Sequence, residues 1–216
     1  MNIKGIIFDL DGTLLDSMSI WENVDKDFLE ENGAVYTRDV SEAVKKMTVF
    51  DSADYFKTKF SLEHSHEYII KRIEEMVSEK YFYSIPLKSG VYETIKKLHE
   101  KKIKMCVATA TYNRLAEAAL KRLEIYDMLE FVLTCSDVGA GKNKPDIFFK
   151  AAEKMNLKIE ETAVVEDSLH CIETAKNAGF FTVGVFDPVS CDDWQKICNT
   201  SDIVVKNINE IINILK

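Results

Sequence analysis

Short apolar runs alternate with segments of helical length from residue 89 to the end of this 216-residue chain. The runs of strand length are KMCVAT (104–109), FVLTC (131–135), TAVVED (162–167), FFTVGVF (180–186) and DIVV (202–205). The segments between them carry apolar residues at helical spacing. Such alternation predicts right-handed βαβ units, and therefore an α/β fold with a doubly wound, mostly parallel sheet.

A helical insertion interrupts this pattern near the N-terminus. Residues 3–10 form an apolar run that ends at DGT and predicts the first strand of the sheet. Residues 17–82 instead show helical periodicity, with one glycine and no proline. We therefore expect a catalytic core of residues 1–16 and 87–216, with a helical cap of residues 17–86 inserted after the first strand.

Polar side chains follow four of the predicted strands. In chain order they are Asp9 and Asp11, then Thr109, then Lys142 or Lys144, then Glu166 and Asp167. The carboxyl ends of parallel strands meet at one edge of the sheet, where ligands bind. Carboxylates crowded there would repel one another without a cation, and a hard divalent cation prefers oxygen ligands. A lysine and a hydroxyl group suit a phosphoryl group, so this edge is predicted to bind both.

Charge, cysteine content and the N-terminal stretch indicate which partners and which compartment to expect. The formal net charge of −8 disfavours nucleic acid, and an anionic substrate then needs a local positive site. The five cysteines are odd in number and form no CxxC pair, which indicates a reducing compartment. The apolar stretch at the N-terminus is too short for a signal peptide or a membrane span. We expect a cytoplasmic monomer without membrane or nucleic-acid partners.

The string DLDGTLLDS at 9–17 resembles the first motif, DxDGTxxDS, of the haloacid dehalogenase-like superfamily. The other family motifs follow in order as VATAT at 107–111, GKNKPDIF at 141–148 and VVEDS at 164–168. The position of the helical insertion is similar to the β-phosphoglucomutase-like branch. The resemblance implies a Rossmann-like core with a helical cap. It also implies a Mg²⁺-dependent phosphatase that acts on a small phosphorylated metabolite, such as a sugar phosphate.

The resemblance also implies a role for each motif residue. Asp9 would be the nucleophile that forms an aspartyl-phosphate, and Asp11 would be the general acid and then the base. The phosphate would be bound by Thr109, Ala110 and Lys142. Mg²⁺ would be held by Asp9, by the backbone carbonyl of Asp11, and by Glu166 and Asp167.

A departure in the third motif and three alternatives qualify this assignment. GKNKPD has Asn143 and Lys144 where the family has proline and a small residue, so Lys144 competes with Lys142. A phosphomutase of the β-phosphoglucomutase type has a cap histidine and arginine, which align here with Trp21 and Val49. A dehalogenase generally lacks the complete acid–base pair, and a catalytically inactive phospho-ligand-binding protein would first lose the nucleophile or the acid. We therefore expect a phosphatase.

Overall fold

The isoleucine-rich run near the N-terminus forms a central strand of a six-stranded parallel sheet in the computed structural model, which describes residues 3–44, 47 and 49–214. The strands are β1 (Gly5–Phe8), β2 (Lys104–Thr109), β3 (Val132–Thr134), β4 (Thr162–Glu166), β5 (Phe181–Val185) and β6 (Ile203–Val205). They lie in the order β3-β2-β1-β4-β5-β6, and every pair is parallel. The predicted α/β class is confirmed.

Two compact units make up the structure. The core unit is Met1–Ser17 with Ile85–Lys216, and the helical unit is Met18–Ser84. The core helices are α5 (Val91–Glu100), α6 (Asn113–Arg122), α7 (Cys135–Val138), α8 (Asp146–Met155), α9 (Leu169–Asn177), α10 (Trp194–Thr200) and α11 (Ile211–Ile214). Short 3-10 turns lie at η1 (Tyr126–Met128), η2 (Ile159–Glu161), η3 (Pro188–Asp193) and η4 (Ile208–Glu210).

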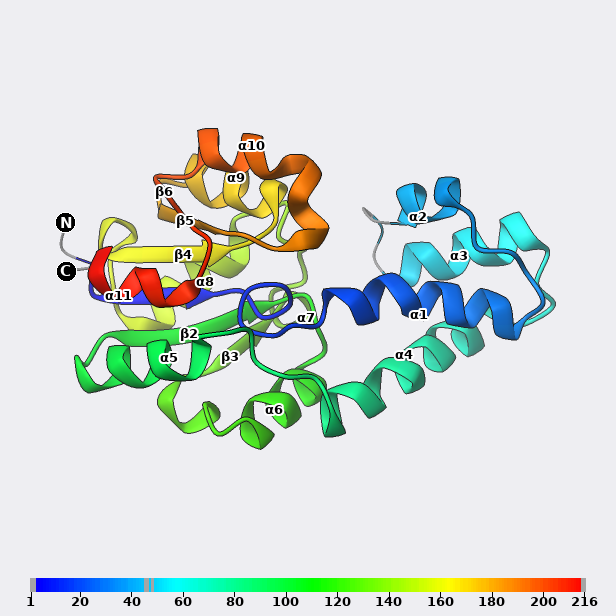
Figure 1. Cartoon of the computed structure of the whole chain (residues 1–216), viewed down its shortest axis with the longest axis horizontal. Helices are drawn as coiled ribbons and strands as arrows, with labels where there is room; N and C mark the ends of the chain where they lie inside the picture. The colour runs from blue at the N-terminus through cyan, green and yellow to red at the C-terminus, as the bar shows by residue number, and fades with distance from the viewer. Residues whose placement is uncertain (1–2, 45–46, 48, 215–216) are drawn as a thin grey trace. The chain divides into compact units, whose positions relative to one another are not determined.

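Both faces of the sheet are covered by helices. Side chains on one face of the strands, such as Ile7, Cys106 and Val164, share a buried cluster with Phe148 of α8 and Ala175 of α9. Helices α5 and α11 contact each other and lie on the other face (Figure 1). Because strand side chains alternate between faces, a sheet covered on both sides requires near-continuous apolar strands, which this sequence has.

The direction of winding reverses at β1. The chain leads from β1 outward through β2 to β3, and then returns across the sheet to β4, β5 and β6. Phe8 pairs in register with Val107 of β2 and with Val165 of β4, so these three strands end at nearly the same level. Ligands of doubly wound sheets bind at such a switch point, outside the carboxyl ends of the strands.

The helical unit contains α1 (Met18–Glu31), α2 (Arg38–Val44), α3 (Val49–Phe60) and α4 (His66–Tyr83), and its described residues include no strand. Phe28 and Phe56 are fully buried and stack with ring centroids 6.1 Å apart. The indole N–H of the half-buried Trp21 donates a hydrogen bond to the Tyr81 hydroxyl over 2.9 Å. The side chain of Val49 lies outside the described residues. No helix among the described residues of either unit is long and apolar enough to cross a membrane.

The prediction of the third strand was wrong at the C-terminal end of that strand. Residues 131–135 were expected to be extended, but β3 stops at Thr134 and Cys135 begins the short helix α7. The Thr134 hydroxyl accepts a hydrogen bond from the Asp137 N–H, and the Asp137 carboxylate accepts one from the Thr134 N–H. This reciprocal capping starts a helical turn that an apolar run does not reveal.

Candidate active site

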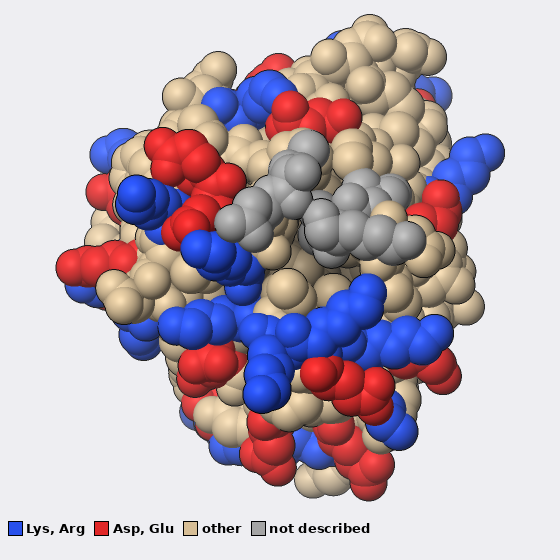
Figure 2. Space-filling model, turned by 90° about the vertical axis from the view of Figure 1, so that its left-hand side faces the viewer, with Lys and Arg blue, Asp and Glu red and all other residues tan. Residues whose placement is uncertain are grey.

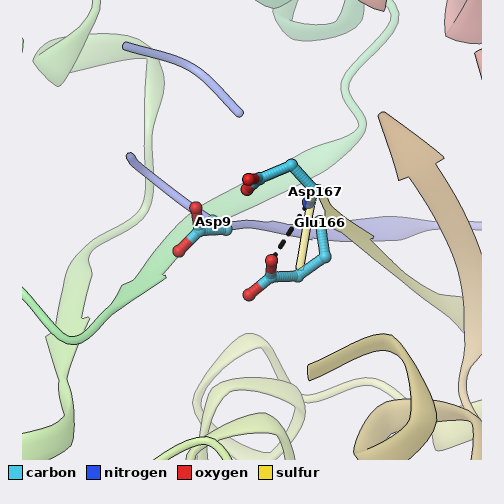
Figure 3. Close-up of side chains that lie close together, drawn as sticks. All are labelled: Asp9, Glu166 and Asp167. Carbon is cyan, nitrogen blue, oxygen red and sulfur yellow. Dashed lines mark hydrogen bonds between the residues drawn. The ribbon is translucent and has the colours of Figure 1, made fainter. Parts of the chain in front are cut away.

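Three carboxylates converge at the switch point of the sheet. Asp9 directly follows β1, whereas Glu166 and Asp167 lie at the end of β4. Each offers an oxygen atom within 4.8 Å of the others, and all three residues are buried. Figure 3 shows the carboxylates gathered around one space, with Glu166 Oε2 accepting a hydrogen bond from the Asp167 N–H over 3.1 Å. Buried carboxylate oxygens at this spacing are a donor set that fits Mg²⁺.

Lys142 supplies the positive charge within this cluster. Its Nζ donates to Oε1 of Glu166 over 2.8 Å and also contacts Oδ1 of Asp9, and the residue is buried. Lys144, two residues further along the chain, is exposed. The structure therefore brings Lys142 to the carboxylates, as the motif alignment predicts.

Burial and mutual repulsion perturb the protonation of the cluster. Burial, with the charge of Glu166, raises the pKa of Asp9 to about 7, although Lys142 opposes the shift. Burial, followed by the charges of Glu166 and Asp9, raises the pKa of Asp167 well above its usual range. Burial lowers the pKa of Lys142, but the two carboxylates outweigh it and raise that pKa well above its usual range. Such a cluster needs a proton or a cation to offset its negative charge.

Asp11 occupies a different environment, although it is only two residues from Asp9. Its Oδ2 accepts a hydrogen bond from the Thr111 hydroxyl over 2.7 Å, and its Oδ1 accepts one from the Ser17 hydroxyl over 2.6 Å. The side chain of Asp11 does not belong to the group of carboxylates that could hold a metal ion. Gly12 follows with a φ of 84°, a left-handed conformation that glycine adopts without strain.

The predicted hydroxyl residue, Thr109, is linked to Asp11 through Thr111. Thr109 ends β2 and is fully buried, and its Oγ1 accepts a hydrogen bond from the Thr111 N–H over 2.9 Å. Ala110, between the two threonines, is exposed. The end of β2 thus carries both the predicted phosphate-binding residues and a hydroxyl group that orients Asp11.

Sequence reasoning missed several polar residues that the structure places at this edge. Thr111 lies within the VATAT motif, so its spacing of two residues from Thr109 was a usable sign. Asp187 follows β5 closely and is 2% exposed, so the pattern of polar residues after strands could have found it. Lys88 donates to Asp187, but it lies just after the helical insertion and no local pattern distinguishes it.

Basic side chains also gather on a face of the core away from these carboxylates. Figure 2 shows a band of Lys and Arg side chains, mixed with acidic ones, on the face that carries the two termini and the amino ends of the strands. The exposed Lys4 is there paired with Glu161, and the exposed Lys101 donates to the Ile212 carbonyl. Lys142 lies at the opposite, carboxyl edge, where it can act on an anion bound beside Asp9.

Comparisons with known proteins agree with this geometry. The family model of haloacid dehalogenase-like hydrolases matches residues 6–185. The phosphorylated carbohydrates phosphatase of Thermotoga maritima is 26% identical over 215 residues, covering 99% of each chain. The β-phosphoglucomutase of Bacillus subtilis is 28% identical, covering 96% of this chain and 95% of its own.

A solved structure shows the same fold at lower identity. CbbY from Rhodobacter sphaeroides, in complex with phosphate, superimposes with a TM-score of 0.83 at 19% identity, covering 97% of this chain and 96% of that one. The family match spans most of the chain, including the strand ends that carry Asp9 and Asp167. The chain belongs to the haloacid dehalogenase-like hydrolase family.

Proposed function

We propose that the protein is a Mg²⁺-dependent phosphatase that hydrolyses a small phosphorylated metabolite, such as a sugar phosphate, through an aspartyl-phosphate on Asp9. One observation carries this proposal. Asp9 lies among the cluster carboxylates and Lys142, whereas Asp11 is held by the hydroxyl groups of Thr111 and Ser17. Two acids in such different environments suit two different roles.

Asp9 and Asp11 act together in the first step, and Asp11 acts as the base in the second. A carboxylate oxygen of Asp9 forms a bond to phosphorus while the ester P–O bond breaks, and Asp11 donates a proton to the leaving oxygen. Asp11 next takes a proton from water as that water attacks the phosphorus of the aspartyl-phosphate. Inorganic phosphate leaves, and Asp9 is regenerated as a carboxylate.

The surrounding residues bind and orient the phosphoryl group. The Lys142 ammonium would offset charge on its oxygens, and Thr109 and the backbone at Ala110 would donate hydrogen bonds to them. Asp9, the Asp11 carbonyl, Glu166 and Asp167 would hold Mg²⁺. The bound ion would offset the negative charge that the carboxylates and the phosphoryl group bring together.

A phosphomutase is the second candidate, because one of the relatives is named as a β-phosphoglucomutase. Trp21 occupies the position of the mutase histidine, and its ring N–H is already engaged by Tyr81. An indole ring cannot exchange a proton as an imidazole does, which favours hydrolysis. We propose that the helical unit, predicted as residues 17–86, acts as the substrate-selecting cap of a cytoplasmic, monomeric enzyme.

The test is phosphate release from a panel of phosphorylated metabolites, with Mg²⁺ and with EDTA. The panel includes β-glucose 1-phosphate with a bisphosphate primer. We expect Mg²⁺-dependent release from one or a few substrates and none with EDTA. Isomerisation of glucose 1-phosphate without net release would identify a mutase. Phosphate binding without turnover of any panel member would identify an inactive binding protein.

A further inference from the structure

Lys88 ties together two loops at the carboxyl edge of the sheet. Its Nζ donates to the carbonyl oxygen of Gly12 over 2.5 Å, in the loop that follows β1. The same Nζ donates to the carbonyl oxygen of Phe186 over 3.0 Å and to Oδ2 of Asp187 over 2.8 Å, in the loop that follows β5. The Lys88 side chain is 17% exposed and that of Asp187 is 2% exposed, so this ion pair is largely shielded from solvent.

Both loops lead directly to the carboxylate of Asp167. Thr13, next to Gly12, donates its hydroxyl hydrogen bond to Oδ1 of Asp167 over 3.0 Å. Ser190, whose N–H donates to the carbonyl oxygen of Asp187, directs its hydroxyl to Oδ2 of Asp167 over 3.4 Å. Each oxygen of this carboxylate is therefore contacted from one of the two loops that Lys88 joins.

The space around Asp167 leaves little tolerance for a shift of the first loop. A Cβ atom added at Gly12 would lie 2.5 Å from Oδ2 of Asp167. The loop is also fixed on its other side, because the Lys88 N–H donates to the carbonyl oxygen of Leu14 over 2.9 Å. Lys88 thus holds the loop through both its backbone and its side chain.

The charge of Lys88 and its hydrogen bonds to the two loops should have opposite effects on the affinity for a cation. A lysine ammonium close to a cation site weakens cation binding by repulsion, so its removal should strengthen binding. A lysine that keeps the loops in place around a ligand should strengthen binding, so its removal should weaken it. The sign of the change therefore separates the two effects.

We propose that Lys88, with Asp187 as its partner, is a positioning residue that holds the Gly12 and Ser190 loops so that Asp167 is oriented to bind a divalent cation. The proposal rests on the function proposed above, because it takes Asp167 as a ligand. The hydrogen-bond partners of the Lys88 ammonium are Gly12, Phe186 and Asp187, none of which belongs to the carboxylate cluster. Its effect passes through Thr13 and Ser190.

The experiment is titration calorimetry of metal-free protein with Mg²⁺, without substrate, on wild type, Lys88→Met and Lys206→Met. Lys206 is exposed and lines the same shallow surface cavity as Lys88, so its variant makes the same charge change nearby. We expect Lys88→Met to weaken Mg²⁺ binding by about tenfold or more, a typical effect of changing a group that orients a metal ligand. Lys206→Met should bind Mg²⁺ as tightly as wild type. Lys88→Gln, which keeps a hydrogen-bond donor, should give an intermediate loss and replaces the methionine variant if that one does not fold.

The outcomes that overturn the proposal are distinct from those that overturn the metal site. Tighter Mg²⁺ binding in both Lys88 variants would show that the lysine acts on the cation through its charge. Unchanged binding would show that its contacts with the two loops do not affect the orientation of Asp167. An equal loss of Mg²⁺ affinity in Lys206→Met would show that the effect does not depend on the hydrogen bonds that Lys88 makes with the two loops. Asp167→Asn is the separate control for the site itself. If it binds Mg²⁺ as wild type does, the proposed metal site fails, whatever the Lys88 variants show.

Discussion

The hydroxyl group of Thr111 donates a hydrogen bond to Oδ2 of Asp11 over 2.7 Å, and its backbone N–H donates to Oγ1 of Thr109 over 2.9 Å. One residue thus connects the proposed general acid to the proposed phosphate-binding hydroxyl. A proton donor must point at the leaving oxygen to be effective, so the orientation of Asp11 is expected to matter for the rate.

Thr111→Val should therefore lower kcat by about 10- to 100-fold, because general acid catalysis typically contributes at least that much. Magnesium affinity should stay unchanged, since the Asp11 side chain lies outside the carboxylate cluster. Steady-state kinetics and Mg²⁺ titration check the two parts. Thr111→Ser, which keeps the hydroxyl group, is the matched control and should retain most of the activity. Equal losses in both variants would contradict an orienting role.

Asp9→Asn should abolish turnover while the protein still folds. An amide is not a nucleophile toward phosphorus, and it has nearly the same shape as the carboxylate. The amide also removes one charge from a crowded buried cluster, so metal-free Asp9→Asn should melt no lower than wild type. Phosphate release and thermal denaturation in EDTA measure the two effects. Substantial residual turnover would rule out Asp9 as the nucleophile.

Lys142→Met should reduce kcat by at least about 100-fold, since a preorganised charge on the transferring group is lost. It should also destabilise the metal-free protein by about 3–5 kcal/mol, because it leaves the Asp9 and Glu166 carboxylates without their buried partner. Urea denaturation measures the second effect. Lys144→Met is the control, and this exposed residue should change stability by no more than about 0.5 kcal/mol. A comparable loss in Lys144→Met would reverse the assignment of the two lysines.

Asp25 of α1 should make stability depend on pH. Burial raises its pKa from 3.8 to about 7. Between these values the folded state keeps a proton that the unfolded chain has released. The contribution of this proton to the free energy of unfolding is therefore complete below about pH 4 and is lost as the pH rises to about 7.

Asp25→Asn should therefore raise the melting temperature at pH 8, and the gain should be smaller at pH 5. Thermal denaturation at the two pH values makes the comparison. Asp27→Asn, at an exposed site on the same helix, is the control for the change in charge, and it should alter stability by no more than about 0.5 kcal/mol. A gain for Asp25→Asn of equal size at both pH values would show that titration of this carboxyl is not its cause.

Much of the fold could be predicted because its determinants are local. The apolar runs, the helical spacing of residues between them and the DGT turn each lie within a few residues of one another. Thr134 is the exception. Its side chain begins α7 where an apolar run suggested a longer strand, because a capping hydrogen bond outweighs the apolar pattern over a single turn.

The sequence by itself determined the α/β class, the family and the polar residues that follow each strand. Only the tertiary structure decided that β1 lies between β2 and β4, which places Asp9 beside both Thr109 and Glu166. It also decided that Lys142 reaches the cluster. In the same way it brought Lys88 to Gly12 and to Phe186, which are 76 and 98 residues away from it in the sequence. The physical reason is that periodicity records which face of an element is apolar, whereas contacts across the sheet depend on strand pairings distant in the chain.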